Sequence, residues 1–343
     1  MAGYEIGEPE LAWWVTQVEE RGPVVSLNGV IRPPVWPPRG DYKLAVNGKI
    51  SAAVDYLRQP DAGAINFRAM LPAASSFGQA DEIELRVMDA TKSEFVRDWD
   101  QYRLAKPGRK SPIPYPPAKL TQRAIWLSPA TFDKEGYALK HKYEEAAKPF
   151  LPKREGKLRL LDWGCGAGRM AKYLAGEFDY TGIDIDKEAI GWCRASIPNA
   201  RFALQELSAH AEFADNSFDA IIGISVFTHL REEDQFAWLA ELSRIAAPDG
   251  LVAVSVNGAT SLFNAGNLPE VIDILLKSGF CDTGAEHSHR GVTSDDTYYR
   301  NAYHTHGYIR ERWSKYFDVL QILPAFVGNM QEMVFLRPKK ARP

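Results

Sequence analysis

The chain has 343 residues, of which 45% are hydrophobic and 25% are charged, so it can form a globular protein with two separate cores. Its net charge of -3 provides no basic surface for nucleic acid or an anionic membrane. The three cysteines lack metal-ligand spacing and an even disulfide count, which favours a reducing cytoplasm. No stretch has the length of a membrane span, and the acidic start is not a secretory signal. We therefore expect a cytoplasmic protein that binds neither nucleic acid nor a membrane.

The first part of the chain has the pattern of short β-strands. Asn-Gly pairs at residues 28–29 and 47–48 favour hairpins, and no helical spacing interrupts the runs. The pattern predicts a small all-β sandwich over residues 1–104, independent of the following domain. The alternating runs cover residues 24–31, 42–54, 64–71 and 83–90.

A proline-rich segment follows over residues 105–118. Its five prolines fix φ and push their predecessors toward extended conformations, so it is predicted to be a semi-rigid linker. Helical spacing then appears over residues 128–150. We expect a second domain over residues 119–343.

The stretch LRLLDWGCGAGR, residues 158–169, has the pattern of a buried strand that ends at Asp162 in a glycine-rich turn before a helix. Glycine permits positive φ and close approach of a ligand, and a helix start supplies N–H groups. The next strand ends at Asp184, about twenty residues on, where dinucleotide-type folds place an acid against ribose hydroxyls. These features predict a cofactor loop with glycines at Gly164, Gly166 and Gly168.

Strands and helices then alternate, as in a doubly wound parallel sheet. A third strand is expected over residues 201–204, a fourth over 220–227 and a fifth over 251–256. After a polar stretch over residues 282–301, two apolar runs predict a closing antiparallel hairpin. The fold class is therefore α/β, with a smaller all-β domain at the N-terminus.

Asp162, the GCGAG core at 164–168 and the GIDID strand end at 182–186 resemble the class I S-adenosylmethionine-dependent methyltransferases. The fingerprint of NAD enzymes, G-x-G-x-x-G, differs from this loop. The resemblance covers residues 120–337 and implies a Rossmann-like seven-stranded sheet, a methyltransferase activity and S-adenosyl-L-methionine as cofactor. It also implies that the helix at 128–150 is part of a lid over the cofactor, although a plain packing helix explains the pattern equally well.

The resemblance further implies cofactor contacts from the ends of four strands. Gln205 and Glu206 are alternatives for the adenine amino group, and Cys165 can equally be just a small loop residue. The implied contact residues are Asp162, Gly164, Cys165, Gly166, Gly168, Asp184, Ile185, Gln205, Glu206 and Ser225.

Two histidines are candidates for a catalytic base. A hydroxyl acceptor must lose its proton as it attacks, and histidine has a suitable pKa for this, whereas a thiol or an amine needs little help. His304, beside the polar stretch, is the first choice. His229 follows the fourth strand, at the edge where open α/β folds bind ligands, but it can instead cap a helix or pack beneath the cofactor. Tyr298, Tyr299 and Tyr308 are expected to line the acceptor pocket or, alternatively, to anchor a loop.

A metal site is not expected. His287, His289 and His306 lie in one region, but they have no partnered cysteine and no tight helical His pair. The predicted cofactor set therefore contains no metal.

Two motifs point to a sugar acceptor. SVFTHL at 225–230 and H-T-x-x-Y-I at 304–309 resemble those of bacterial methyltransferases associated with surface glycans, and the N-terminal domain resembles immunoglobulin-like modules of glycan-modifying enzymes. The chain departs from that pattern at residues 331–332, which are Gln-Glu where Gln-Asp is expected. The resemblance implies O-methylation of a sugar hydroxyl in a bacterial glycan or its precursor.

Two other functions stay open. One is methylation of a nitrogen, carbon or carboxylate of another small molecule, which needs no histidine base. The other is a non-catalytic glycan-binding protein with a vestigial cofactor domain, against which the intact set of Asp162, glycines and Asp184 argues. The substrate is expected to be a small molecule or a glycan, and self-association into a homo-oligomer is left open.

Overall fold

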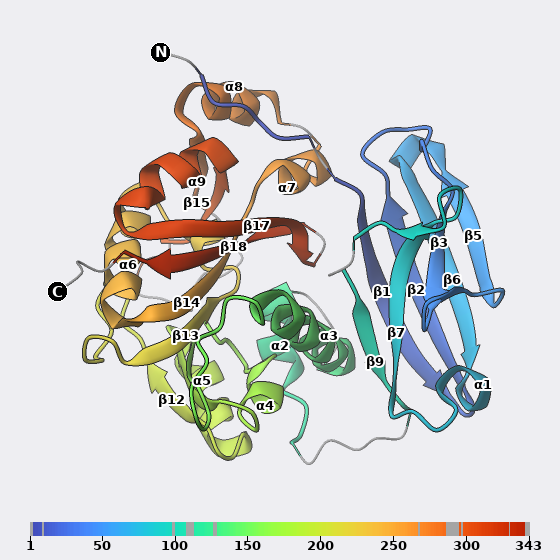
Figure 1. Cartoon of the computed structure of the whole chain (residues 1–343), viewed down its shortest axis with the longest axis horizontal. Coiled ribbons are helices and arrows are strands. Elements are labelled where there is room, and N and C mark those ends of the chain that lie inside the picture. The colour runs from blue at the N-terminus through green and yellow to red at the C-terminus, as the bar shows by residue number, and fades with distance from the viewer. Residues whose placement is uncertain are drawn as a thin grey trace. The chain divides into compact units, whose positions relative to one another are not determined.

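The computed structural model divides the chain into two compact units (Figure 1). The β unit contains Pro9–Tyr115 and Leu127–Ala146, and the α/β unit contains Met1–Glu8, Pro116–Trp126 and Ala147–Pro343. The residues described are 3–8, 10–97, 100–107, 113–125, 129–266, 268–285, 295, 298–328 and 330–339.

The β unit contains two antiparallel sheets that share one core. Apolar residues at alternate positions of the strands, such as Leu27, Leu44, Phe67 and Leu85, belong to this core. One sheet has the order β1-β2-β6-β5, and the other has the order β4-β3-β7-β8 with β9 paired to β7. The elements are β1 (Ala12–Arg21), β2 (Val24–Arg32), β3 (Tyr42–Val46), β4 (Lys49–Ile50), β5 (Val54–Gln59), η1 (Pro60–Ala62), β6 (Ala64–Pro72), α1 (Ala73–Phe77), β7 (Glu82–Asp89), β8 (Glu94–Phe95) and β9 (Tyr102–Ala105).

The two Asn-Gly pairs lie in different kinds of secondary structure. Asn47 and Gly48 both have positive φ, at 49° and 79°, and connect β3 to β4, which confirms the predicted turn. The prediction for Asn28 and Gly29 was wrong, because both lie inside β2. A Cβ on Gly29 would lie 2.2 Å from the ring of Phe67, so this glycine makes room for a core side chain. The strands β1, β5, β8 and β9 were also missed by the sequence pattern.

Helix α3 (Pro129–Ala147) groups with the β unit, apart from its last residue. Lys142 Nζ lies 2.7 Å from Asp100 Oδ1, Tyr137 donates a hydrogen bond to Glu82, and Ala138 belongs to the β core. The expected boundary at residue 119 assigned this helix to the second domain. Its sequence shows that it is a helix, but only long-range contacts show which core it joins.

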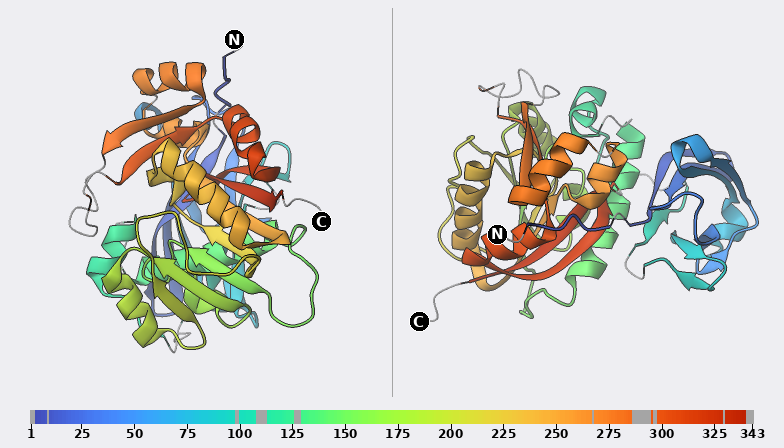
Figure 2. Two further views of the ribbon diagram at one scale, coloured as in Figure 1. Left: turned by 90° about the vertical axis from the view of Figure 1, so that its left-hand side faces the viewer. Right: turned by 90° about the horizontal axis from the view of Figure 1, so that it is seen from above.

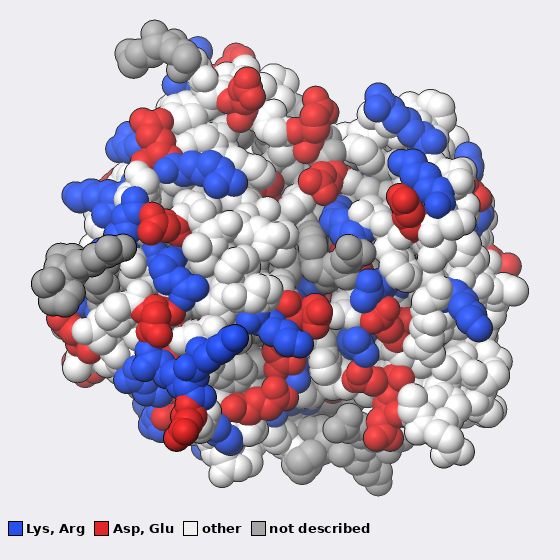
Figure 3. Space-filling view, in the orientation of Figure 1, with Lys and Arg blue, Asp and Glu red and all other residues white. Residues whose placement is uncertain are grey.

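The Lys142–Asp100 ion pair is inside the β unit, since both residues are buried. Asp100 also pairs with Arg97, at 2.9 Å, whereas ion pairs at the surface, such as Arg21 with Glu19, contribute little to stability. On the face shown in Figure 3, acidic and basic side chains are interspersed.

Asp100→Ala should lower the free energy of unfolding by about 3 kcal/mol, because it removes the nearest countercharge of a buried ammonium group. Urea denaturation followed by tryptophan fluorescence measures this. The matched control is Glu19→Ala at the exposed Arg21 pair, for which we expect a change below about 0.5 kcal/mol. Equal effects of the two substitutions would contradict a stabilising role of the buried pair.

The α/β unit is built on a central sheet, and its mixed α/β character agrees with the expected class. The strand order is β12-β11-β10-β13-β14-β18-β17, in which β10 to β14 pair in parallel and β18 and β17 pair antiparallel (Figures 1 and 2). The strands are β10 (Arg159–Trp163), β11 (Asp179–Asp184), β12 (Arg201–Leu204), β13 (Phe218–Gly223), β14 (Ala246–Val256), β17 (Phe317–Val327) and β18 (Gln331–Pro338).

Helices connect and cover these strands. Trp238 of α6 packs against Trp163 of β10, with ring centroids 4.7 Å apart, in the same core cluster as Ile221 and Trp313. The helical elements are α2 (Ala118–Ile125), α4 (Ala171–Leu174), α5 (Lys187–Ser196), η2 (Phe227–His229), α6 (Glu232–Ile245), α7 (Ala259–Asn264), α8 (Pro269–Ser278), α9 (His306–Arg312) and η3 (Trp313–Lys315). Within the described residues, no helix is long and apolar enough to cross a membrane.

The polar stretch at 282–301 begins and ends in strands. β15 (Phe280–Ala285) and β16 (Arg300–His304) form a two-stranded antiparallel sheet. Residues 286–294 and 296–297 lie outside the described residues. Backbone bonds anchor β16 to the main sheet, since His304 N–H donates to the carbonyl of Asn257, which follows β14.

Candidate functional site

The predicted site residues come from strands that end at one edge of the central sheet. β10, β11 and β13 are parallel, so their carboxyl ends, with Asp162, Asp184 and then Ser225, meet there. β18 runs the opposite way and starts at this edge, where Glu332 pairs with Val256. The edge is thus lined by residues that are far apart in the sequence, from Asp162 in β10 to Glu332 in β18.

The glycine-rich loop after β10 is tied to the end of β11. Gly164 N–H and Cys165 N–H both donate to the Ile183 carbonyl, at 2.8 and 3.1 Å. Gly166 N–H donates to Asp184 Oδ2 at 2.7 Å, and Asp184 Oδ1 accepts from Asp186 N–H at 2.8 Å. One carboxylate therefore connects the loop to the segment that starts α5.

The three loop glycines have different roles, although all have positive φ. A Cβ on Gly164 would lie 2.4 Å from Val226, and one on Gly168 would lie 2.6 Å from Ile197, so these two permit close packing. A Cβ on Gly166 would meet no described atom within 4 Å. Gly166 is therefore the position where a ligand can approach the loop backbone.

Both predicted acids lie in low-dielectric surroundings. Burial raises the pKa of Asp184 to about 6, against the opposing effect of its backbone N–H donors. Burial likewise raises the pKa of Asp162 to about 6, and a hydrogen bond from Tyr180 Oη, 2.5 Å from Oδ2, opposes the rise. Asp162 is 4% exposed, so its carboxylate lies within the unit, where it bonds to Tyr180 of β11, whereas Asp184 is only partly buried.

Cys165 contributes its side chain to the packing beneath the loop. Its thiol and that of Cys193 both lie near the Gly166 carbonyl, at 3.7 and 3.5 Å. The hydrogen bond with Cys193, together with burial, raises the pKa of the Cys165 thiol well above its usual range. This agrees with the alternative of a small loop residue, whose backbone N–H already bonds to Ile183.

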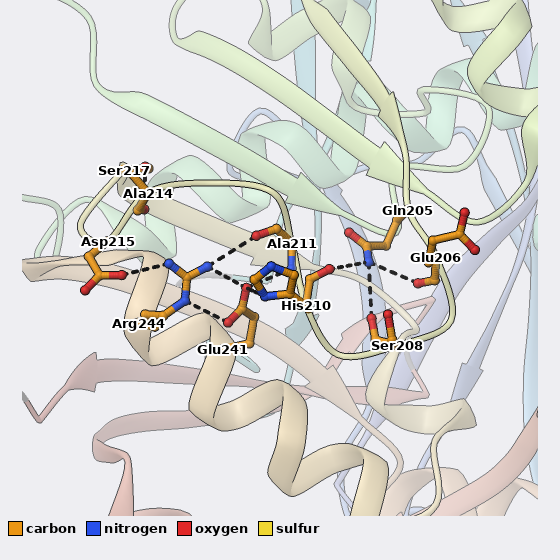
Figure 4. Close-up of polar contacts among 10 residues, drawn as sticks. All are labelled: Gln205, Glu206, Ser208, His210, Ala211, Ala214, Asp215, Ser217, Glu241 and Arg244. Atoms are coloured by element: carbon orange, nitrogen blue, oxygen red, sulfur yellow. Dashed lines mark hydrogen bonds and ion pairs between the residues drawn. The ribbon is translucent and has the colours of Figure 1, made fainter.

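Gln205 organises the loop that follows β12. Its side chain is buried, and its Nε2 donates to the carbonyls of Glu206, Ser208 and His210 at 3.0, 3.2 and 2.9 Å (Figure 4). Glu206 itself is exposed. Of the two alternatives for the adenine amino group, Glu206 is therefore the better placed.

The same loop is anchored to α6. Ala211 N–H donates to Glu241 Oε1 at 2.7 Å, and Arg244 bridges Glu241 and Asp215 (Figure 4). Arg244 also donates to the Ala211 carbonyl. These bonds hold the segment between β12 and β13 against α6.

His229 lies in η2, just after β13, and is partly exposed. Its Nδ1 is 2.9 Å from the carbonyl oxygen of Arg300. The ring centroids of His229 and Tyr299 are 5.3 Å apart, so the fold brings together these two predicted residues. Ser225 precedes η2 with a positive φ of 58°, and its N–H donates to Ser255 Oγ at 2.7 Å.

His304 does not fit the role expected of it. The residue is 2% exposed, and its ring packs among Phe280, Tyr308 and Trp313. Its Nε2 lies 2.8 Å from Gln235 Oε1. Burial lowers its pKa to about 3, so the ring is neutral and enclosed rather than directed at an acceptor.

Two of the three predicted tyrosines are also core residues. Tyr308 is 1% exposed and donates to Glu232 Oε1 at 2.5 Å, while burial raises the pKa of Tyr298 to about 12. Their hydroxyls anchor the segment, which was the alternative considered for such tyrosines. Tyr299 is partly exposed and is the member of the set nearest His229.

The sequence analysis noted residues 331–332 only as a departure from the glycan-associated pattern and did not predict the polar cluster that they form at this edge. Gln331 Oε1 accepts from Ser225 Oγ at 3.0 Å and from Ser255 Oγ at 2.7 Å, joining β18 to β13 and β14. The buried carboxylate of Glu332 pairs with His306 Nε2 at 2.5 Å. These residues start the last strand of the sheet, and the only sequence signal was a polar pair before an apolar run.

The helix implied as a lid also differs. α3 makes the β-unit contacts described above, whereas α2 reaches the cofactor edge of the α/β unit. Arg123 Nη1 lies 2.7 Å from Asp186 Oδ2 at the start of α5, and Lys119 pairs with Glu188. The helix before β10 that contacts the start of α5 is therefore α2.

Among the described residues, no three His, Cys, Asp or Glu side chains gather as a metal site. His306 pairs with Glu332, and His287 and His289 lie outside the described residues.

A glycine-rich loop after the first parallel strand, with an acid at the end of the next, defines a nucleotide-type cofactor domain in an α/β fold. Residues 161–254 match the family described as a methyltransferase domain. This match to a methyltransferase domain agrees with the resemblance that the sequence motifs indicated.

Two curated relatives match part of the chain. A fatty-acid O-methyltransferase of Mycolicibacterium smegmatis is 36% identical over 101 residues, or 28% of this chain and 35% of the relative. Methyltransferase GfsG of Streptomyces halstedii is 28% identical over 131 residues, or 36% of this chain and 44% of the relative. The matched region therefore spans less than half of either relative.

Solved structures include an S-adenosylmethionine-dependent methyltransferase of Clostridium acetobutylicum, which is 12% identical over 65% of this chain and 98% of its own, with a TM-score of 0.43. A likeness at this level says nothing of the substrate.

The residues present fit the cofactor. Gly166 leaves the loop backbone open to a ligand, and the partly buried Asp184 provides carboxylate oxygens that can accept from ribose hydroxyls. Exposed Glu206 can accept from an adenine amino group. These three positions, on separate strand ends, are the residues that we expect to hold S-adenosylmethionine.

Asp184→Ala should weaken binding of S-adenosylmethionine and S-adenosylhomocysteine alike by about 1 to 3 kcal/mol, the cost of losing a charged hydrogen-bond partner. For the unsubstituted protein, affinity should be constant above pH 7 and fall as the pH drops through about 6, because protonation removes the acceptor. Titration calorimetry across this range measures both effects. Asp184→Asn should flatten the pH dependence, and Asp249→Asn, at an exposed acid of β14, is the control. Unchanged affinity of the Ala variant would contradict this assignment.

Proposed function

We propose that the protein transfers the methyl group of S-adenosylmethionine to a hydroxyl oxygen, with His229 as the general base. The observation that carries this proposal is the position of His229, partly exposed after β13 and bonded through Nδ1 to the Arg300 carbonyl. The cofactor, when bound, supplies an electrophilic methyl group on a positively charged sulfur. The chain must then align the acceptor, exclude water and remove a proton.

The contact of His229 determines its tautomer when the ring is neutral. A carbonyl oxygen can only accept, so Nδ1 carries the proton and donates it to Arg300 O. The lone pair of the neutral ring is then on Nε2. A histidine in this tautomer can accept a hydroxyl proton at Nε2 while Nδ1 stays bonded.

His304 is the weaker candidate for the base. An enclosed ring whose pKa is lowered to about 3 accepts a proton poorly at neutral pH. Tyr299, whose ring lies beside that of His229, is the better candidate for an acceptor contact.

A sugar is the acceptor that we favour. Besides the sequence motifs, the outer face of the sheet β1-β2-β6-β5 supports this choice, because it contains a hollow of about 510 Å³. Its lining combines polar groups that suit hydroxyls with apolar surface, including Leu57, which is 63% exposed. Register places Arg68 opposite both Asn28 and Asp55, in one polar row. We propose that this face holds a glycan.

A carboxylate acceptor is the second candidate. The relative named fatty-acid O-methyltransferase supports it, since that name describes methyl transfer to an acid. A carboxylate is ionised at neutral pH and needs no base. The dependence on His229 therefore separates the two candidates.

His229→Ala should lower turnover by about 10²- to 10⁴-fold, the usual contribution of a general base, and leave cofactor affinity unchanged. The assay uses labelled S-adenosylmethionine with a panel of nucleotide sugars, oligosaccharides and fatty acids. The matched control is His210→Ala at an exposed histidine. A full rate for His229→Ala, or methylation of fatty acids alone, would contradict the proposal in favour of the carboxylate acceptor.

Arg68→Ala and Asp55→Ala should each weaken oligosaccharide binding by about 2- to 10-fold, as expected for the loss of a hydrogen bond of about 0.5 to 1.5 kcal/mol. Calorimetry with the same oligosaccharides measures this on the full chain. Glu94→Ala, on the other sheet of the β unit, is the control. If the three variants bind oligosaccharides with equal affinity, or if the unsubstituted protein does not bind them, this face is not a glycan site.

A further inference from the structure

A glutamine lies on the apolar face of α6. Gln235 is 1% exposed and precedes Trp238, Leu239 and Leu242 on the side of the helix that faces the core. An amide in this position is costly unless its donors and its acceptor are bonded. Its polar contacts therefore account for its presence there.

The contacts of Gln235 reach two different elements. Its Nε2 donates to the carbonyls of Phe227 and Leu230, at 3.0 and 3.1 Å, and its Oε1 lies 2.8 Å from His304 Nε2. Carbonyl oxygens only accept, so the amide orientation is fixed, and Oε1 must be the acceptor for His304. The Nε2 of His304 therefore carries a proton and donates it.

The two carbonyls that Gln235 contacts flank His229 in the sequence. Phe227 and Leu230 lie on either side of it along the chain, at the start and just after the end of η2. His304 is the last residue of β16, and Arg300, whose carbonyl accepts from His229, is the first. Two ties thus join the same pair of elements: the direct bond from His229 to Arg300, and the bridge through Gln235 to His304.

We propose that Gln235 is a positioning residue, which braces η2 against β16 and thereby keeps His229 Nδ1 on the Arg300 carbonyl. The brace determines on which ring nitrogen the neutral His229 carries its proton. His304 is the second half of the brace, which explains a buried histidine in a motif that first suggested catalysis. The catalytic meaning of the brace rests on the proposed function, but the brace itself does not.

The tautomers of the ring can be observed without any acceptor. The experiment uses the full chain labelled with ¹⁵N-histidine, and long-range ¹H–¹⁵N spectra at pH 7.5 report which ring nitrogen carries the proton. His229→Gln and His304→Gln variants assign the signals. In the unsubstituted protein we expect the Nδ1–H form for His229 and the Nε2–H form for His304.

Gln235→Met keeps a similar volume but forms none of the three bonds. The ratio of the Nδ1–H to the Nε2–H form of His229 should fall at least threefold. Gln235→Glu keeps an acceptor for His304 but cannot donate to the two carbonyls. It should change the His229 ratio in the same direction while His304 keeps its Nε2–H form.

Gln122→Met, the same substitution at an exposed position on α2, is the matched control and should leave both tautomers unchanged. Binding of S-adenosylhomocysteine should stay within threefold in all variants. A purely structural role would lower the melting temperature and leave the His229 ratio unaltered. That result in either Gln235 variant, or an Nε2–H form of His229 in the unsubstituted protein, overturns the proposal.

Turnover separates this inference from the proposed function. With an acceptor identified, Gln235→Met should lower kcat in step with the tautomer ratio and leave KM for S-adenosylmethionine unchanged. If His229→Ala keeps full turnover while Gln235→Met still shifts the tautomer, the brace stands and the function of His229 as a base fails.

Discussion

The carboxylate of Asp184 is the group on which the cofactor side of the site depends. It accepts from Gly166 N–H, in the loop after β10, and from Asp186 N–H, before α5. Burial raises its pKa, but two N–H donors oppose the rise and stabilise the charged form. The same group that holds the loop in place is thereby kept available as an acceptor at neutral pH. The geometry of the loop and the expected contact with the cofactor consequently involve one side chain.

The other side of the site is assembled from segments far apart in the chain. η2 follows the fourth parallel strand, whereas β16 lies about seventy residues later and is attached to the main sheet through Asn257. Between them, the buried polar side chains of Gln235 and His304 lie beside the apolar packing around Trp238 and Trp313. A hydrogen bond has a direction, so such groups can fix the orientation of one ring where apolar contacts alone would fix only its position.

The structure of the β unit followed only in part from local sequence patterns. Alternation of apolar residues identified β2, β3, β6 and β7, because one face of each of these strands meets the shared core. The Asn28–Gly29 pair was misinterpreted because glycine is needed there for the close approach of the Phe67 ring, which is a long-range contact. Helix α3 was recognised as a helix, yet its ties to Asp100 and Glu82 could not be read from its own pattern.

The sequence by itself determined the strand-loop-helix unit around Gly166, the acid at Asp184 and the α/β class, because these depend on backbone freedom and on spacing within a few dozen residues. It also indicated a histidine at the edge of the sheet. Only the tertiary structure shows that His304 is enclosed while His229 is partly exposed, since burial and hydrogen-bond partners arise from segments that meet after folding. The same reason applies to Gln235: its chemistry is visible in the sequence, but the carbonyls and the imidazole that it joins become neighbours only when η2, α6 and β16 pack together.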